Sequence, residues 1–514
     1  MLFAQKGEIR LDSFYEFERD RVFFGLHNGA VNHAQGVNGK IAGNLEAFAQ
    51  IKDAAILLHG PKGCAYHYRY YARRRWLPAY AIESDDLTET DLIGGGEEKL
   101  FDAALRIIGE QHPGLLVLIP TVSSDVMQSD LLGVAGAVTE RTGVPVVAVR
   151  SEVFSHIDKT VMRRERKDTL KCWGKAEAPK NSDSRGCGFS EAMLTLAEQL
   201  MQPQETVRGA VNVEGYAWSY GGRMLLEGMD AMLREMGLRL LNILPHGTTQ
   251  EIVRAPAAQL NIARRMRWAQ ALGERFGTPY LHVHAFTRYL GVEGVLQFYR
   301  DIAQKLGLSV DVDALFSREA ARARERFAAC TAAYAGKRIL MLPRSFRMLP
   351  NRITQAVLGA GIPVTDVVAM YTEEELRQAD LDAEMAEDVL RNTRRAMELC
   401  GVGGELIVNP DPETLRELAQ SADLMIANEE TQAFGPNIPI LSDDLLFVAP
   451  LDFEQLCRNA EYLAGGLDRL PRGGRLLINR VSYAKGLYPQ LDTPEAQTAR
   501  ELWQRLWQNR GREV

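Results

Sequence analysis

Short apolar runs alternate with longer amphipathic segments along most of this chain. A short apolar run bounded by Gly or Pro predicts a buried strand, whereas apolar residues at every third or fourth position predict a helix. Strands that alternate with helices in this way indicate a parallel sheet covered by helices on both faces. In the first third of the chain, the predicted strands are 54–58, 114–120 and 144–149, and the predicted helices are 100–111 and 124–142.

The same alternation occurs twice more, and it predicts the domain organisation. The second set has strands at 209–214 and 239–244, a helix that begins at 259–265 and a strand after Gly277. The third set has strands at 337–342, 362–370, 406–408 and 424–427 and helices at 351–358, 372–399 and 411–421. We therefore predict an α/β fold of three Rossmann-like parallel-sheet domains, at 1–204, 205–335 and 336–450. We expect residues 451–514 to form helices that pack on the first domain or on a partner.

The charge balance gives no reason to expect a polyanionic partner. The 514 residues carry a formal net charge of -7, and 46% of them are hydrophobic and 25% charged. Such a chain has no general electrostatic affinity for nucleic acid or for an anionic membrane. No apolar run approaches the ~20 residues that span a bilayer, and the N-terminal residues lack the apolar core of a signal peptide. We therefore expect a cytoplasmic protein.

Cys64 is the first candidate for chemistry. It follows the predicted strand 54–58 and the break His59-Gly60-Pro61, so it stands at a strand-to-helix turn. The positive end of a helix is a place where a thiolate can be stabilised. The helix behind it, 66–76, is dense in Tyr and Arg. These side chains suit either a core-facing stripe with a solvated opposite face, or the shielding of a metal cluster and contact with a partner.

Two motifs in this region resemble the nitrogenase component 1 superfamily. His59-Gly60-Pro61-Lys62-Gly63-Cys64 resembles the HGPxGC turn that supplies an iron–sulfur cluster ligand in that family. The segment 87–100, LTETDLIGGGEEKL, resembles the family's E-x-D-hydrophobic-x-x-G-G-x-x-K-L segment, which follows the turn. The superfamily comprises the molybdenum-iron protein subunits, their cofactor-assembly scaffolds and the nitrogenase-like reductases. Both motifs occur in the family's order and at its spacing, which makes the resemblance specific, and the resemblance extends over most of the 514 residues.

The resemblance also shows where ligands are missing. The other cluster cysteines of the family's half-site correspond to a position near Asn38 and Gly39 and to Val122, and none of these residues carries a thiol. The half-site of three cysteines is thus reduced to Cys64. Cluster iron needs thiolate ligands, although another donor can replace one of them.

Two further cysteines are candidates for the lost ligands. Cys187 precedes a predicted helix whose counterpart approaches the interface cluster in some β-type subunits of the family, and Cys172 begins the same polar loop. The alternative for both is a free thiol in a loop. The chain has no CxxC motif, and its remaining cysteines are predicted to be small buried hydrophobic residues. These are Cys330, Cys400 and Cys457.

By resemblance, the cluster is shared between two chains. One chain that offers Cys64, with Cys187 as a candidate, cannot enclose a 4Fe-4S or 8Fe-7S type cluster alone, so an α-type partner in an α2β2 heterotetramer is implied. The α-type subunits of the family anchor a large cofactor through a Cys and a His. The matching stretches here, 263–266 and 435–444, contain neither. The chain therefore resembles a β-type subunit, and an ATP-dependent reductase similar to the iron protein would deliver its electrons.

The resemblance implies an oxidoreductase that relays electrons to a small-molecule substrate, and it leaves the reaction open. Reduction of a C–S bond, as in methylthio-alkane reductase, is the first candidate, and tetrapyrrole reduction, as in dark protochlorophyllide reductase, is the second. A scaffold that assembles a nitrogenase-type cofactor is the non-enzymatic alternative. A third hypothesis is a metal-free partner in which Cys64 is only a core residue. No residue is assigned a catalytic role.

Overall fold

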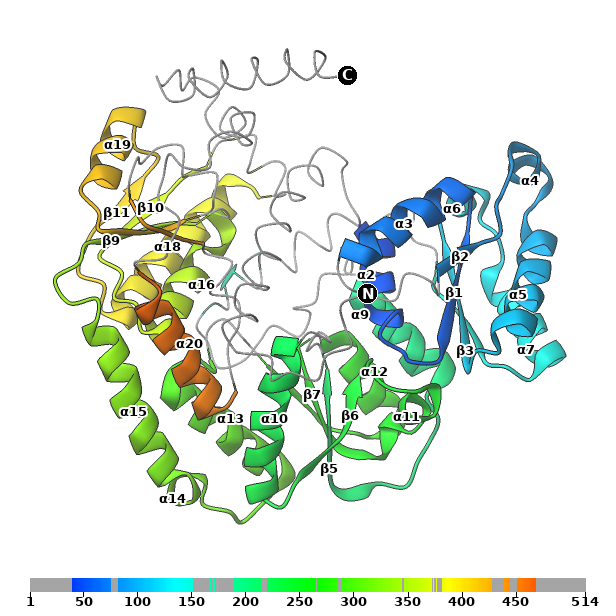
Figure 1. Cartoon of the computed structure of the whole chain (residues 1–514), viewed down its shortest axis with the longest axis horizontal. Coiled ribbons are helices and arrows are strands. Elements are labelled where there is room, and N and C mark those ends of the chain that lie inside the picture. The colour runs from blue at the N-terminus through cyan, green and yellow to red at the C-terminus, as the bar shows by residue number, and fades with distance from the viewer. Residues whose placement is uncertain are drawn as a thin grey trace, which may run out of the picture.

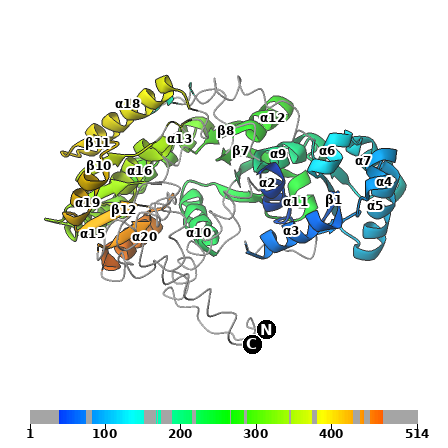
Figure 2. The same cartoon turned by 90° about the horizontal axis from the view of Figure 1, so that it is seen from above.

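Three parallel sheets follow one another along the chain and round an open arc (Figure 1). The structure is a computed structural model that describes residues 39–74, 82–150, 167, 170–171, 173, 188–214, 220–264, 266–283, 288–343, 346–371, 373, 376, 381–427, 438–442 and 451–467. Every pairing between its named strands is parallel. Seen from above, the three units keep the same order, with the second in the middle (Figure 2). The predicted α/β class of parallel sheets is confirmed.

The first sheet has the strand order β2-β1-β3-β4. Successive side chains of a strand point to opposite faces of the sheet. Helices cover both faces here, so the central strands are buried on both sides. Ile56 and Leu58 of β1 pack in the core that α2 and α9 cover, whereas Ala55 and Leu57 pack in the core under α5 and α7. The strands are β1 Ala54–His59, β2 Ile82–Ser84, β3 Leu115–Pro120 and β4 Val146–Ala148. The helices are α2 Gly39–Phe48, α3 Lys62–Arg74, α4 Glu89–Gly94, α5 Glu97–Gln111, α6 Val122–Met127, α7 Leu131–Thr142 and α9 Gly188–Thr195, which continues as a π-helical turn, Leu196–Leu200.

The second sheet has the order β6-β5-β7-β8, and it corrects one prediction. The helix expected from 259–265 is wrong, because 259–263 belong to a buried strand between β5 and β8. Leu260 and Ile262 face one core, and Asn261 on the other face accepts a hydrogen bond of 2.8 Å from the Asn212 amide. The strands are β5 Val207–Glu214, β6 Arg239–Leu244, β7 Ala258–Ala263 and β8 Tyr280–His282. The helices are α10 Tyr220–Glu235, α11 Thr249–Val253, α12 Met266–Phe276, α13 Gly291–Leu306, α14 Val312–Leu315 and α15 Ser317–Ala332.

The third sheet has the order β11-β10-β9-β12-β13. Its strands lie within the third predicted domain range, and β11 and β12 have the predicted bounds. A single long helix is predicted at 372–399. The helix that the structure shows there begins only at Ala383, where Asp382 caps it. The strands are β9 Ile339–Leu342, β10 Asp366–Ala369, β11 Leu406–Val408, β12 Leu424–Ala427 and β13 Ile440–Ser442. The helices are α16 Leu349–Thr354, which continues as a π-helical turn, Gln355–Gly359, then α18 Ala383–Cys400 and α19 Pro412–Gln420.

The C-terminal helix α20, Phe453–Gly465, packs on the second unit. It lies against α10, α13 and α15, and Phe453, Leu456 and Cys457 enter the core of that unit. Arg326 of α15 pairs with Glu454 of α20 at its edge. This helix thus contacts the second unit rather than the first, and the alternative of a contact with a partner stays a prediction. The rest of the tail, from residue 468, lies outside the described residues.

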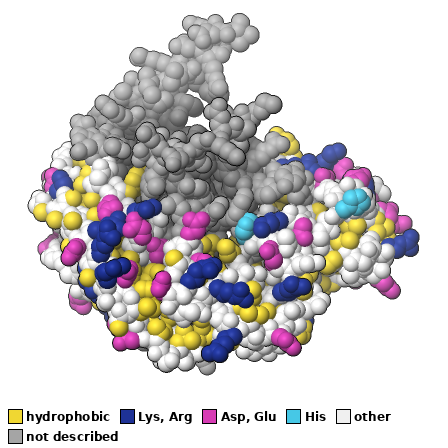
Figure 3. Space-filling model, turned by 60° about the horizontal axis from the view of Figure 1, so that its bottom comes forward, with side chains coloured by type: hydrophobic (Ala, Val, Ile, Leu, Met, Phe, Trp, Pro, Cys, Tyr) yellow, Lys and Arg dark blue, Asp and Glu magenta, His cyan; other side chains and the backbone are white. Residues whose placement is uncertain are grey.

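The surface of the described residues mixes both signs of charge. On the face that Figure 3 shows, Lys and Arg side chains lie interspersed with Asp and Glu side chains. A mixed surface provides no extended basic stripe for a nucleic-acid backbone on this face. Among the described helices, none has both the length and the apolar character that crossing a membrane requires.

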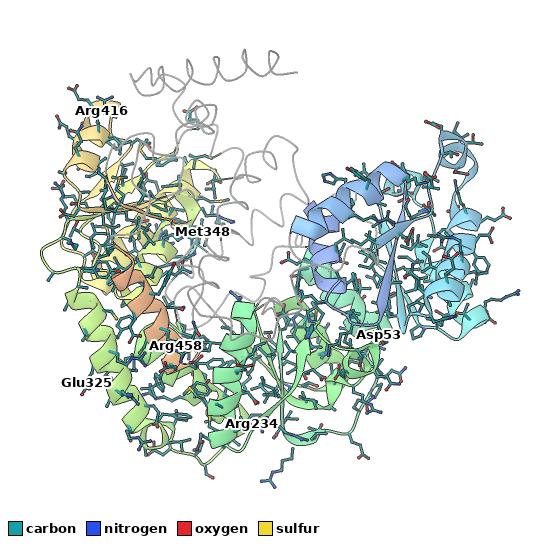
Figure 4. The ribbon with its side chains drawn as sticks, viewed as in Figure 1. Asp53, Arg234, Glu325, Met348, Arg416 and Arg458 are labelled. Carbon is teal, nitrogen blue, oxygen red and sulfur yellow. The ribbon has the colours of Figure 1, made fainter. Side chains whose placement is uncertain are left out.

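The first and second units are joined by a hydrogen-bonded clamp at Asp53. Its carboxylate accepts hydrogen bonds from the backbone N (2.8 Å) and the hydroxyl (2.9 Å) of Thr249, at the start of α11. Lys52 N donates to Gly247 O over 2.8 Å, so the backbones are tied directly as well. Figure 4 labels Asp53 at this junction. The two units are therefore held in a fixed orientation at this point.

Replacing Asp53 with alanine is expected to loosen the junction. The change leaves the N–H and O–H of Thr249 without their acceptor, which costs about 1–3 kcal/mol for buried donors. We expect a lower midpoint of thermal unfolding and faster proteolysis near residue 53. The control is Asp102→Ala, which removes an exposed carboxylate from α5. Equal midpoints for the two variants would contradict the clamp.

Candidate metal centre at the end of strand β1

Cys64 lies in the first turn of α3, directly after the carboxyl end of β1. Strand β1 is flanked by β2 and β3, so three parallel strands end at the same edge of the sheet. This edge is where open α/β sheets hold their ligands. The Cys64 side chain is partly buried, and its backbone N donates to Pro61 O over 2.9 Å. The predicted strand-to-helix turn is therefore present, with its thiol at the ligand-binding edge.

Ser84 at the end of β2 and the two residues that follow it hold the turn before Cys64. Gly60 N donates to Asp85 Oδ1 over 2.9 Å, and Gly60 O accepts a hydrogen bond of 2.6 Å from Ser84 Oγ. Lys62 N donates to Asp86 Oδ1 over 3.2 Å, and Asp86 itself has a left-handed φ of 58°. The turn is thus bonded to the end of β2 at Gly60 and at Lys62.

The second motif, residues 87–100, stabilises the loop that holds the cysteine turn. Thr88 and Asp91 form a capping box at the start of α4, and Thr88 N donates to Asp91 Oδ2 over 2.7 Å. Lys99 Nζ, from α5, donates to Asp91 Oδ2 over 2.7 Å and to Asp86 O over 2.6 Å. The hydrogen bond from Lys99, followed by those from Thr88, lowers the pKa of Asp91 to about 2. The described contacts of Asp91 and Lys99 therefore stabilise the Asp86 loop that holds the cysteine turn.

Two glycines of the turn provide a matched test of its packing. A Cβ on Gly60 would lie 2.2 Å from Thr121 Oγ1, whereas a Cβ on Gly63 would have nothing within 4 Å. We expect Gly60→Ala to displace the turn and to destabilise the chain by about 1–3 kcal/mol, as overpacking does. Gly63→Ala should be neutral or stabilising by up to about 1 kcal/mol, because alanine favours the helix.

The measurement is iron content together with the unfolding midpoint of both variants. We expect iron to be lost from Gly60→Ala and kept in Gly63→Ala. Equal iron in the two variants would show that the position of the turn does not matter for metal binding.

Burial dominates the electrostatics of Cys64. It raises the pKa of the Cys64 thiol, in the direction opposite to the thiolate stabilisation expected from the helix end. The thiol of the metal-free chain is therefore protonated at neutral pH. Iron binding must displace this proton, so metal loading is expected to become easier as the pH rises.

The two positions without family cysteines also lie at helix starts. Gly39 is the first residue of α2, which packs beside α3. Val122 is the first residue of α6, and its apolar side chain is 49% exposed. Because Pro120 pairs with His59 across β3 and β1, the turns that lead to Val122 and to Cys64 are neighbours. Neither Gly39 nor Val122 offers a donor side chain for iron.

Cys187 and Cys172 lie outside the described residues, but their neighbours are placed. Gly188 and Phe189, directly after Cys187, lie against Gly43 of α2, whose added Cβ would be 2.6 Å from Phe189 N. The residues around Cys172 are held by the third unit instead. Trp173 Nε1 donates to Asn351 Oδ1 of α16 over 2.7 Å, and Leu170 O accepts a 2.7 Å hydrogen bond from Asn392 of α18. The residues directly after Cys187 thus lie against α2, which packs beside α3, while the described neighbours of Cys172 lie on the third unit.

The described side chains of helix α3 agree with the core-facing stripe, whereas the shielding of a cluster and the contact with a partner stay predictions. Tyr68 packs against the first core, as a core-facing stripe requires, whereas Tyr66 is 75% exposed. Arg69 Nε donates to Ile82 O over 2.6 Å and pairs with Glu83, so this guanidinium braces β2. The side chains of 70–76 lie outside the described residues.

The other described cysteines are structural. Cys330 and Cys457 are buried, as predicted, whereas Cys400 is only partly buried at the end of α18. Burial raises the pKa of both Cys400 and Cys457 to about 11. These thiols are protonated at neutral pH, and none of them lies in the first unit.

The donor set tests whether an iron–sulfur cluster fits. Within the described ranges, no group of three or more His, Cys, Asp or Glu side chains is arranged to hold a metal ion. Cys64 provides one thiol at the exposed edge of a sheet, which fits one corner of a cluster. The other ligands must come from outside the described residues, from this chain or from another one.

Comparison with known proteins agrees with this geometry. The family model described as nitrogenase component 1 type oxidoreductase matches residues 40–161 and 174–442. The cofactor biosynthesis protein NifE of Nostoc sp. (strain PCC 7120) is 24% identical over 421 residues, which are 78% of this chain and 76% of that protein. The NifE protein of Klebsiella pneumoniae is 26% identical over 76% of this chain and 80% of its own length. The nitrogenase molybdenum-iron protein alpha chain of Azospirillum brasilense is 28% identical over 46% of this chain and 47% of its own length.

A solved structure shows the same fold. The structure titled "Nitrogenase Cp1 at pH 6.5" superposes with a TM-score of 0.53 at 18% identity, and it covers 84% of this chain and 88% of that one. At this identity the likeness concerns the architecture alone. It agrees with three parallel-sheet units in one chain.

Proposed function

The chain belongs to the nitrogenase component 1 type oxidoreductases, and we propose that it is a subunit of a nitrogenase-like reductase that shares an iron–sulfur cluster with a homologous partner. The observation that carries the proposal is the turn His59 to Cys64, which is hydrogen-bonded to two neighbouring strand ends and presents one partly buried thiol at the sheet edge. Cys64 would be the surest ligand of this chain. When bound, such a cluster accepts and releases electrons at low potential.

The ligand count supports a shared cluster. One described thiol in the first unit is too few for a 4Fe-4S or 8Fe-7S type cluster, and we propose that the partner subunit supplies most of the others. Cys187 is the candidate second ligand from this chain, because the residues after it lie against α2, beside the helix that bears Cys64. Cys172 is less well supported, because its neighbours are bonded to the third unit.

We propose a β-like role in an α2β2 assembly, placed in the cytoplasm. The molybdenum-iron protein chain named above is an alpha chain, so the β-like assignment rests on the missing cofactor ligands at 263–266 and 435–444. Ala263 ends strand β7 and has no thiol to offer. An ATP-dependent reductase similar to the iron protein would deliver electrons to the shared cluster, and a site held mainly by the partner would use them.

The first candidate reaction is reductive cleavage of a C–S bond, as in methylthio-alkane reductase. The thioether would take up two electrons and two protons and release a thiol and a hydrocarbon. Reduction of a tetrapyrrole, as in protochlorophyllide reductase, is the second candidate. The residues of this chain would hold the cluster through Cys64, and the hydrogen bonds to Gly60 and Lys62 would keep the turn beneath it in place.

A specific observation favours a second function, that of a scaffold for assembly of a nitrogenase-type cofactor. The NifE relatives are cofactor biosynthesis proteins by name, and they match this chain over three quarters of its length or more. A scaffold would use the same thiol to hold a cluster, but it would hand the cluster on rather than turn over a substrate.

Anaerobic purification of the chain with its natural partner separates the two functions. The complex is assayed with an ATP-dependent iron protein, ATP and an alkyl methyl thioether, and the thiol product is measured. ATP-dependent thiol release supports the reductase, and tetrapyrrole reduction in the parallel assay would change only its substrate. An iron-loaded complex that turns over neither substrate, but transfers metal to a cofactor-free nitrogenase, would establish the scaffold instead.

A further inference from the structure

We propose that His59 is a positioning residue for Cys64. The buried His59 ring fixes the backbone that leads to Cys64, and it thereby determines the direction in which the Cys64 sulfur points from the edge of the sheet. The inference rests on the proposed role of Cys64 as a cluster ligand. It concerns a side chain that lies five positions before the thiol, within the same turn. We expect it to act through the backbone of that turn, without touching the metal itself.

Both nitrogens of the His59 ring are engaged. The side chain is fully buried, with Nδ1 lying 2.5 Å from Asp85 Oδ2 and Nε2 lying 3.0 Å from Ser129 Oγ. Because an ionised carboxylate can only accept, we assign the Nδ1 proton to the bond with Asp85. In the neutral ring, Nε2 then accepts from the Ser129 hydroxyl. The plane of the ring is fixed by two partners from opposite sides.

The same carboxylate also holds the backbone that leads to Cys64. Asp85 Oδ1 accepts from Gly60 N over 2.9 Å, so one side chain binds both the ring and the next peptide. The carbonyl of His59 accepts from Thr121 N at 3.1 Å and from Thr121 Oγ1 at 2.9 Å. Rotation of the ring would therefore disturb the peptide at which the chain turns toward Cys64.

The His59 ring packs closely against Gly96. A Cβ added to Gly96 would lie 2.8 Å from His59 Cε1, so the glycine just before α5 makes room for the imidazole. Ser129 comes from the short connection between α6 and α7, where Gln128 adopts a left-handed φ of 56°. Elements that are distant in sequence thus converge on one ring.

If His59 only filled space in the core, its ring would not need the hydrogen bonds to Asp85 and Ser129. An apolar side chain of similar volume could fill the space and would need no buried carboxylate opposite it. A buried polar network whose members are satisfied specifies one geometry, which is what a metal ligand needs. Removing the partners that orient a ligand typically weakens metal binding by about 10–100-fold.

The test compares His59→Leu with His59→Asn. Leucine keeps much of the volume but no hydrogen bond, whereas the asparagine amide can still donate toward Asp85. The control, His112→Asn, changes the exposed histidine that ends α5 at φ 48°, a conformation that asparagine tolerates. Each full-length variant is purified with its partner. The measurements are iron loss to a chelator, the EPR line positions of the remaining reduced cluster and, on metal-free protein, the alkylation rate of Cys64 with iodoacetamide.

We expect His59→Leu to lose iron about tenfold faster than the wild type, to shift the EPR lines and to change the alkylation rate. His59→Asn should restore much of each property, and the His112 control should match the wild type. If His59→Leu lowers iron occupancy but leaves the EPR lines and the alkylation rate unchanged, the residue is merely structural and the inference fails.

The failure of the proposed function has a different signature. In that case Cys64→Ala retains all its iron, while the alkylation rate of metal-free protein still reports whether His59 positions the thiol. A His59→Leu variant that alkylates at the wild-type rate would overturn the positioning role whatever the metal does. If that variant does not fold, His59→Asn and Ser129→Ala provide the same measurements with smaller perturbations.

Discussion

Cys64→Ala is expected to remove most of the iron from the assembled complex. The substitution deletes the one described thiol at the carboxyl edge of the first sheet, and no other described side chain of the turn can replace a thiolate. We expect iron per chain to fall by at least about tenfold, since losing a ligand should cost no less than losing a group that orients one. Elemental analysis and EPR of anaerobically purified protein measure the effect.

The matched control is Cys400→Ala. Cys400 is also a partly buried free thiol, but it lies at the end of α18 in the third unit, and burial raises its pKa to about 11. We expect this variant to keep its iron and its EPR signal. Unchanged iron in Cys64→Ala would instead support the metal-free hypothesis, in which Cys64 is an ordinary residue of the turn.

Asp452→Asn is expected to stabilise the chain at neutral and alkaline pH. Asp452 caps α20 by accepting from Gln455 N over 2.8 Å, and its carboxylate is pressed against Gly228 of α10, at 2.4 Å from where a Cβ would stand. Burial raises the pKa of Asp452 from 3.8 to about 6. The folded state therefore disfavours the ionised form, and an asparagine can cap the helix without the charge.

The sign of the pH dependence follows from the raised pKa. Well below pH 3.8, the ordinary pKa of the group, the carboxyl group is protonated in both states and costs no stability. Between pH 3.8 and about 6 the unfolded chain ionises while the folded chain stays largely protonated, so stability falls as the pH rises, and no more is lost above this range. The full shift corresponds to about 3 kcal/mol. We expect Asp452→Asn to gain about 2–3 kcal/mol at pH 8 and roughly half of that at pH 5.

Denaturant unfolding of the full chain at pH 5 and pH 8 measures this difference. The control, Asp411→Asn, makes the same chemical change at the N-cap of α19, where hydrogen bonds from Thr414 lower the pKa of the carboxyl group. It should give no gain at either pH. A loss of stability in Asp452→Asn that is equal at both pH values would mean that the carboxylate is favourably solvated.

Strands with mainly apolar runs could be predicted from the sequence. The bounds predicted at 239–244, 406–408 and 424–427 agree with β6, β11 and β12. Strand β7 was missed because Gln259 and Asn261 are polar residues in a buried segment. Their partners lie in other strands or loops, since Gln259 Oε1 accepts from Gly209 N and Asn261 accepts from Asn212. A pattern along one segment cannot reveal such partners, although Ala258, Leu260 and Ile262 do alternate with a period of two.

The helix predicted at 124–142 is two helices for a similar reason. Gln128 takes a left-handed conformation, Ser129 binds the His59 ring, and Asp130 caps α7 through Gly133 N at 2.9 Å. Ser-Asp before a pair of leucines is a helix-start signal that could have located the break. The hydrogen bond between Ser129 and the His59 ring could not be predicted, because the two residues are 70 positions apart in the sequence.

The candidate site, too, could be predicted only in part from the sequence. The turn at Cys64 and the motif 87–100 were identified from the sequence, and their described residues form one bonded unit. The roles of Asp85 and Ser129 were not predicted, because strand order is needed to bring them to His59. Val122 was identified as a missing ligand, and its place at a neighbouring helix start follows from the pairing of β1 with β3.

The most direct test of the shared cluster is a crystal structure of the anaerobically purified complex, with anomalous diffraction measured on both sides of the iron absorption edge. We predict an iron peak bonded to Cys64 Sγ, within a cluster whose other ligands include thiolates of the partner subunit. An anomalous map with no iron beside this sulfur, in crystals that contain iron elsewhere, would contradict the account.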